Sequence, residues 1–231
     1  MTEAEWLACA DPNHVLKFLG GNFLSGSGSE RKLRLFTCAC CRRIWHLLAD
    51  ERSRRNVEIT EKYVDGLASA DEANDAMNGA DQAWRDFERD NPDAGNFANR
   101  STNCGCWAAY YTDFPEWGAR EARTSAVWEK AALGIDHRAA EAAEQARQSD
   151  TLRDIFGNPF RPVTFSPSWR TSTVVALASQ MYESRDFSAM PTLADALRDA
   201  GCQSADMLDH CRAPGPHVCG CWVVDLVLGK E

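Results

Sequence analysis

Apolar residues recur at helical spacing along most of the chain, and this periodicity constrains the fold more than any other feature. Between residues 31 and 49, for example, Leu33, Phe36, Cys40 and Ile44 follow one another at intervals of three or four residues. That spacing places them on one face of an α-helix. No segment alternates apolar and polar residues as a half-buried strand does. The sequence therefore predicts an all-α protein, built as a multi-helix bundle or a layered helical array.

Proline and glycine divide this helical pattern. Residues 25–29 read Ser-Gly-Ser-Gly-Ser, which is typical of a flexible loop. Residues 157–167 contain three prolines, and each disfavours the α conformation in the residue before it. The sequence thus predicts a helical region over 1–156, then a Pro-rich extended arm and a C-terminal helical subdomain over 157–231. A single integrated domain is the alternative.

Composition narrows the class of protein. The 231 residues are 44% hydrophobic and 26% charged, so the chain can bury a sizeable core. The net charge of −9 argues against a dedicated binder of duplex DNA or of an anionic membrane. The N-terminus has no pattern of a signal peptide, and no apolar run reaches the roughly 18 residues of a membrane-spanning helix. We expect a cytoplasmic protein with reduced thiols.

Charge is distributed unevenly along the chain. Residues 31–55 carry eight basic and two acidic side chains, whereas residues 65–93 carry nine acidic and two basic ones. The basic stretch could bind nucleic acid or an acidic partner. Two neighbouring helices that neutralise each other explain the pattern more simply, and we favour this interpretation.

Ten cysteines are many for a reducing compartment. Free cysteine is often buried as a small hydrophobic residue, which is the main expectation here. Cys38 and Cys41 form a C-x-x-C pair, but they lie within a predicted helix rather than at the N-terminus that a thioredoxin-like site requires. Most of the thiols are therefore predicted to be structural, with metal and redox roles as alternatives.

The densest group of metal-ligating residues lies near the C-terminus. His210, Cys211, His217 and Cys221 fall within twelve residues, with Cys219 among them. Zinc is bound by four such nitrogen and sulfur ligands, so this group is a candidate zinc site. Adjacent residues on a helix point about 100° apart, which opposes ligation by both His210 and Cys211. Otherwise Cys211 and Cys221 belong to the core and His217 caps the last helix.

Aromatic residues form a second candidate surface. Trp107, Tyr110, Tyr111 and Trp117 are close in sequence and could line a groove for a peptide or a partner helix, or could pack in the core. The chain contains no G-x-S-x-G, H-E-x-x-H or phosphate-binding loop motif. We therefore predict no catalytic residues.

Three sequence blocks carry a resemblance. Residues 38–48 (CACCRRIWHLL), 154–162 (DIFGNPFRP) and 220–231 (GCWVVDLVLGKE) resemble the signature blocks of an uncharacterised planctomycete protein family. The resemblance implies a bacterial, cytoplasmic protein and no particular activity. The chain departs from the family pattern at residues 20–29, which lengthen a connection, and at Cys219, where family members look basic.

These observations favour a non-catalytic helical interaction or regulatory module with an unidentified protein partner. A zinc-stabilised helical domain with a nucleic-acid-binding or regulatory role is the alternative, and a Cys-dependent enzyme is the third.

Overall fold

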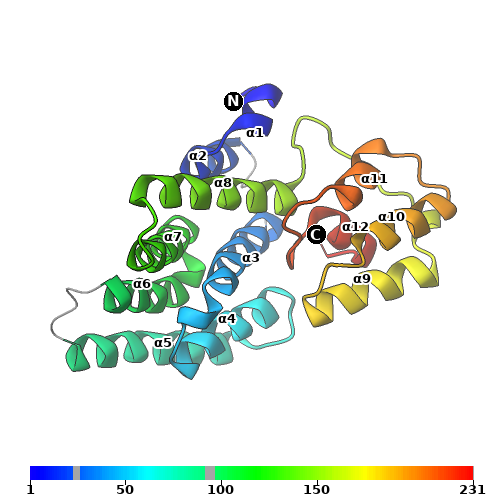
Figure 1. Ribbon diagram of the computed structural model, residues 1–231. Helices are drawn as coiled ribbons and strands as arrows, with labels where there is room; N and C mark the ends of the chain where they lie inside the picture. The colour runs from blue at the N-terminus through cyan, green and yellow to red at the C-terminus, as the bar shows by residue number, and fades with distance from the viewer. Residues whose placement is uncertain (23–26, 92–96, 231) are drawn as a thin grey trace. The chain divides into compact units, whose positions relative to one another are not determined.

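A computed structural model describes residues 1–22, 27–91 and 97–230. All regular structure within these ranges is helical and comprises twelve α-helices and three 3-10 turns, which confirms the all-α fold (Figure 1). The chain divides into two compact units, one formed by Ala8–Ser149 and the other by Met1–Leu7 with Asp150–Glu231. The division into regions 1–156 and 157–231 stays a prediction. None of the described helices combines the length and apolarity that crossing a bilayer requires.

The unit Ala8–Ser149 is a layered array of helices. It contains α2 (Pro12–Asn22), α3 (Ser27–Arg43), α4 (Glu51–Val64), α5 (Ala70–Asp90), α6 (Phe97–Tyr110), α7 (Pro115–Ala132) and most of α8 (His137–Phe156), with 3-10 turns η1 (Trp45–Leu47) and η2 (Tyr111–Asp113). Helix α3 packs against α4, α6 and α7, and α5 packs against α4 and α6. Phe36, Ile44, Leu48 and Val57 are buried in its core. Each such side chain contributes about 1.5–3 kcal/mol on burial.

An ion-pair network around the buried Glu144 carboxylate joins three helices of this unit. The Glu144 carboxylate accepts hydrogen bonds from Arg43 at 2.9 Å, Lys130 at 2.8 Å and Arg147 at 2.9 Å. Burial raises the pKa of Glu144, but the bonds and charges of Lys130 and Arg43 outweigh it and lower that pKa below the ordinary value. Glu144 is therefore ionised at neutral pH and links α8 to α3 and α7.

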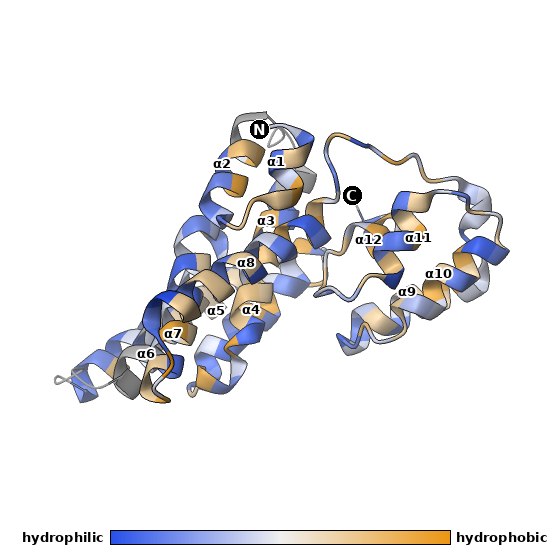
Figure 2. Ribbon diagram, turned by 45° about the horizontal axis from the view of Figure 1, so that its top comes forward, coloured by the Kyte–Doolittle hydropathy of each residue, from blue (hydrophilic) through white to orange (hydrophobic). Residues whose placement is uncertain are grey.

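The second unit is smaller and has its own core. Its helices are α1 (Glu3–Ala8), the last turns of α8, α9 (Ser172–Ser184), α10 (Met190–Asp199), α11 (Ala205–Arg212) and α12 (Trp222–Leu228), with the 3-10 turn η3 (Pro167–Trp169). Figure 2 shows hydrophobic and hydrophilic segments mixed along these helices, as expected of helices with one buried face. Met181, Leu193 and Val224 lie in the core. The Arg153 guanidinium donates to the Trp6 carbonyl oxygen at 2.9 Å, which ties the N-terminal helix to α8.

Several helix ends have local causes in the sequence. Ser69 and Glu72 form a capping box at the start of α5, in which each side chain bonds to the other residue's backbone N–H. Gly157 follows α8 with a φ of +68°, and Gly201 follows α10 with a φ of +89°. Glycine adopts this left-handed conformation without the Cβ penalty of other residues, so both positions end their helices.

Two expectations about local structure need correction. Helix α3 begins at Ser27, so the loop expected over residues 25–29 is helical from that point, while residues 23–26 lie outside the described part. The helix expected to reach residue 49 ends at Arg43, and a separate 3-10 turn, η1, follows it.

Candidate metal centre

Four side chains of the second unit converge as a potential metal site. Asp154, His210, His217 and Cys221 each offer one ligand atom, and these atoms all lie within 4.8 Å of one another. They come from the last turn of α8, the last turn of α11, the connection that follows it, and the N-cap of α12. The site therefore joins α8 to two C-terminal helices that are distant from it in sequence.

The spacing of the ligand atoms suits one small cation. Asp154 Oδ1 lies 2.8 Å from His217 Nδ1 and 3.1 Å from His210 Nε2, which in turn lies 3.3 Å from Cys221 Sγ. Bonds of about 2.0–2.3 Å from a central zinc ion would place tetrahedral ligand atoms roughly 3.3–3.6 Å apart. The three observed separations lie at or below this range, by up to about 0.8 Å, so the side chains would have to move apart slightly to admit an ion of this size.

Backbone geometry positions these ligands. The Val218 backbone N–H donates to Asp154 Oδ2 at 3.0 Å, which leaves Oδ1 directed at the two imidazoles. Gly220, with a φ of +93°, lets the chain turn into the N-terminus of α12, where Cys221 is the cap residue. A partner on the second carboxylate oxygen is the kind of support that orients metal ligands.

The carboxylate of the site is shielded from solvent. The Asp154 side chain is 3% exposed. Burial raises the pKa of Asp154, but hydrogen bonds and charges from His210 and His217 outweigh it and lower that pKa. Burial, and next the Asp154 charge, raise the pKa of Cys221 well above its ordinary value. The thiol is therefore protonated unless a bound cation takes the place of its proton.

Two further observations concern the imidazoles. His217 Nε2 is buried and has no hydrogen-bond partner in the described part of the chain. A buried polar atom of this kind costs about 1–3 kcal/mol and calls for a functional explanation. The centre of the Trp222 ring lies 5.2 Å from that of the His210 ring. The Trp222 ring also packs against Gly157. Trp222 thereby limits where the His210 ring can lie.

The structure brings together three of the four residues proposed from sequence as ligands. Cys211 is not in the group; it lies in α11, is 1% exposed, and has a pKa that burial raises to about 12. Its neighbour His210 points into the group instead, as the angle between adjacent helical residues suggested. Asp154 takes the fourth place and was not predicted. Cys219 lies elsewhere, with its Sγ 3.7 Å from the Tyr182 carbonyl oxygen.

The cysteines of the C-x-x-C pair are buried in the core. Cys38 and Cys41 are buried in α3, where burial raises the pKa of each thiol well above the ordinary value. Burial likewise raises the pKa of Cys40, between them, to about 12. Nucleophilic thiol chemistry needs the thiolate, which is scarce at neutral pH under these conditions.

The residues proposed for partner binding lie at the junction of α6, η2 and α7. The Tyr111 ring lies 5.0 Å from that of Tyr110 and 6.0 Å from that of Trp117. Trp117 is 50% exposed, and the Arg120 guanidinium lies 4.3 Å above its ring. The side chain of Trp107 lies outside the described part. The described residues thus form an aromatic cluster that is partly open to solvent.

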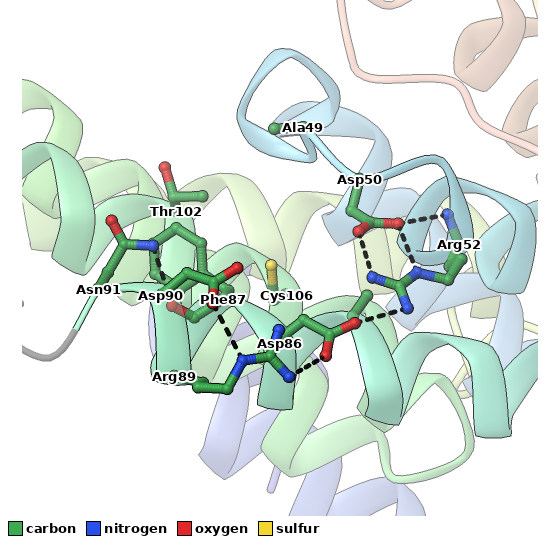
Figure 3. A pocket seen from close by; sticks show the side chains of 11 residues that line it. Ala49, Asp50, Arg52, Asp86, Phe87, Arg89, Asp90, Asn91, Thr102 and Cys106 are labelled. Atoms are coloured by element: carbon green, nitrogen blue, oxygen red, sulfur yellow. Dashed lines mark hydrogen bonds and ion pairs between the residues drawn. The ribbon is translucent and has the colours of Figure 1, made fainter.

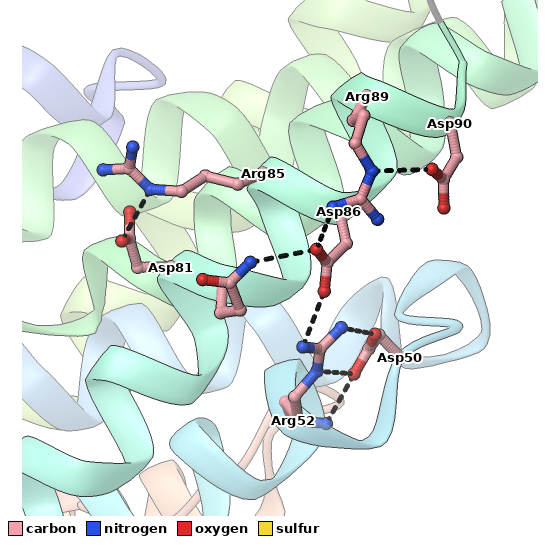
Figure 4. Close-up of polar contacts among 8 residues, drawn as sticks. Asp50, Arg52, Asp81, Arg85, Asp86, Arg89 and Asp90 are labelled. Carbon is pink, nitrogen blue, oxygen red and sulfur yellow. Dashed lines mark hydrogen bonds and ion pairs between the residues drawn. The ribbon is translucent and has the colours of Figure 1, made fainter.

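Part of the basic stretch faces the acidic helix, as the simpler interpretation of the charge pattern required. Arg52 donates to Asp50 at 2.7 Å and to Asp86 of α5 at 2.8 Å (Figure 4). On α5 itself, Arg85 pairs with Asp81 at 2.8 Å. These guanidinium groups are neutralised within the unit, which weakens their attraction for phosphates.

A cavity of about 420 Å³ opens beside this network (Figure 3). Its wall carries Arg52 and Arg89, both ion-paired with aspartates, together with Phe87 and the thiol of Cys106. Burial raises the pKa of Cys106 to about 11. The cavity therefore presents paired charges and a protonated thiol rather than an activated nucleophile.

Comparison with known proteins adds no functional assignment. No protein family model, curated protein or solved structure matches the chain.

Proposed function

We propose that the second unit is a zinc-stabilised helical module, with Asp154, His210, His217 and Cys221 as the four ligands. The observation that carries this proposal is the convergence of their ligand atoms within 4.8 Å. Two imidazoles, a thiolate and a carboxylate match the donors that zinc takes in proteins. Calcium and magnesium prefer shells of oxygen ligands, so this donor set disfavours them.

Charge balance supports the same ion. An ionised Asp154 and an ionised Cys221 contribute two negative charges, and neutral histidines contribute none. A divalent cation makes the buried group neutral overall, which avoids the large cost of burying a net charge. Zinc would also displace the thiol proton of Cys221, whose pKa is otherwise raised by burial.

The site supports a structural role. Four protein side chains complete a tetrahedral zinc shell, whereas catalytic zinc sites keep one position for water or substrate. The ligands come from α8, α11, the connection after it and the N-cap of α12, so the ion would tie α8 to two helices that contribute to the C-terminal core. Structural zinc contributes on the order of 10 kcal/mol to the folding of small domains. We infer a non-catalytic module whose fold, and hence whose interaction or regulatory role, depends on zinc.

The test is the zinc content of protein purified without chelators and without a metal-binding tag. We expect one zinc per chain in the wild type and a loss of most of it in Cys221→Ser. Cys211→Ser is the matched control, because it changes a buried thiol of the same unit that lies outside the group. Wild-type protein with less than about a tenth of an equivalent of zinc, under conditions in which structural sites are filled, would refute the proposal. Equal loss in both variants would also refute it.

A further inference from the structure

A small cavity in the unit Ala8–Ser149 is lined by buried polar side chains. It measures about 220 Å³ and lies among α4, α5 and η2. Asn56, Thr60 and Thr112 line it, and they are 1%, 5% and 2% exposed, respectively. Buried polar groups normally satisfy one another or water. The hydrogen bonds of these three side chains therefore show what the cavity offers to a ligand.

The Asn56 side chain has a fixed orientation and a free acceptor. Its Nδ2 donates to the Ala109 carbonyl oxygen at 2.7 Å and to Thr112 Oγ1 at 3.3 Å. Because a carbonyl oxygen can only accept, the Ala109 contact determines which end of the amide is nitrogen. Asn56 Oδ1 makes no hydrogen bond with the described residues, and it is not among the polar atoms sealed from solvent. The cavity thus reaches an unused acceptor.

The threonine pair supplies a donor. Thr60 Oγ1 and Thr112 Oγ1 lie 3.1 Å apart, so one of the two hydroxyls donates to the other. Each hydroxyl carries a single hydrogen, and Thr112 Oγ1 already accepts from Asn56. One hydroxyl hydrogen of the pair therefore remains unused by the described residues. Asn56 and the threonine pair thus offer one acceptor and one donor to the cavity.

The remaining wall excludes a charged ligand. Arg34 lines the cavity but is paired with Asp113 at 2.8 Å and with Glu30 at 2.8 Å. No unpaired charge of the wall is left to compensate a carboxylate or an ammonium group taken out of water. Met77 and Ala73 provide an apolar surface for the carbon part of a ligand.

We propose that this cavity binds an uncharged small molecule through a primary carboxamide group. The amide N–H of the ligand donates to Asn56 Oδ1, and its carbonyl oxygen accepts from the hydroxyl of Thr60 or Thr112. A planar carboxamide presents its donor and acceptor side by side, as the cavity requires. This site is separate from the zinc proposal and depends on no metal.

The experiment is a nuclear magnetic resonance titration of the full chain with benzamide and three analogues. Acetophenone keeps the shape and the carbonyl but lacks the N–H donors; benzoate and benzylamine carry charges. We expect benzamide to shift the resonances of residues lining the cavity and to saturate. Acetophenone should bind about fivefold more weakly, because Asn56 Oδ1 stays unpaired. The charged analogues should bind at least roughly tenfold more weakly.

Two variants locate the binding. Ala73→Phe fills the cavity without removing a buried hydrogen bond and should abolish benzamide binding. Ala139→Phe makes the same change at an exposed position of α8 and should leave the affinity unchanged. Acetophenone binding as tightly as benzamide, or Ala73→Phe binding benzamide as the wild type does, would overturn the proposal. So would the lack of any saturable shift at the cavity.

Discussion

Replacing Gly157 by alanine tests whether Trp222 holds His210 in place in the proposed zinc site. Gly157 has a φ of +68°, where a Cβ costs about 1–2 kcal/mol. A Cβ there would also lie 3.2 Å from Cγ of Trp222, closer than ordinary van der Waals contact. The indole must therefore move by a few tenths of an ångström, and it packs 5.2 Å from the His210 ring.

Gly201→Ala is the matched control for this change. Gly201 has a φ of +89° in the same unit, and a Cβ there would meet no atom within 4 Å. Both variants should therefore lose about 1–2 kcal/mol of stability from backbone strain. Gly157→Ala should in addition weaken zinc binding by about 10-fold or more, as changes to the supports of metal ligands do.

The assay is a competition titration of zinc against a chromophoric chelator, together with denaturant unfolding of each zinc-loaded variant. We expect Gly201→Ala to bind zinc as the wild type does and Gly157→Ala to bind it more weakly. If both variants keep the wild-type zinc affinity, the proposed support of His210 through Trp222 is wrong.

Other changes probe the packing and charge of each unit. Gly118→Ala should lose about 1–3 kcal/mol, because its Cβ would lie 2.7 Å from the Tyr111 carbonyl oxygen, whereas Gly79→Ala should gain about 0.5–1 kcal/mol of helix propensity. Denaturant unfolding in which both variants change the free energy of unfolding in the same direction would contradict this expectation. Arg170→Ala should cost about 1–2 kcal/mol by calorimetry, since it removes two 2.8 Å hydrogen bonds to the last carbonyls of α12; an unchanged melting temperature would disprove it. The ion pairs of Glu144 lower its folded-state pKa. Their contribution to the free energy of unfolding is therefore complete above the unfolded-state pKa of about 4.3, and it is lost as the pH falls through the folded-state pKa. The stability difference between wild type and Glu144→Gln should accordingly be constant from pH 7 to about 5 and shrink below that. A stability difference that does not change with pH would contradict the lowered pKa of Glu144 in the folded state.

Local sequence signals predicted much of the fold because they act within a few residues. The helical spacing of Leu33, Phe36 and Cys40 falls within α3, and the Pro-rich residues 157–167 lie between α8 and α9. In α6, Gly105 and clustered aromatic residues weaken the helical pattern. Packing against α7 and α5 supplies what local propensity lacks there.

The candidate metal site could be predicted only in part from the sequence. His210, His217 and Cys221 are close along the chain, so their density was visible. Asp154 is one of 34 acidic residues and lies on another helix, and nothing local distinguishes it. Its place in the group follows from its contacts with His210, His217 and the Val218 backbone, which join residues more than fifty positions apart in the chain.

X-ray absorption at the zinc edge of the zinc-loaded wild type identifies the ligand atoms of the proposed site. We expect one sulfur at about 2.3 Å and three nitrogen or oxygen atoms at about 2.0–2.2 Å. Cys221→Ser should lose the sulfur scatterer, whereas Cys211→Ser should keep it. A shell of six oxygen or nitrogen atoms without sulfur would contradict the assignment, and so would two or more sulfurs.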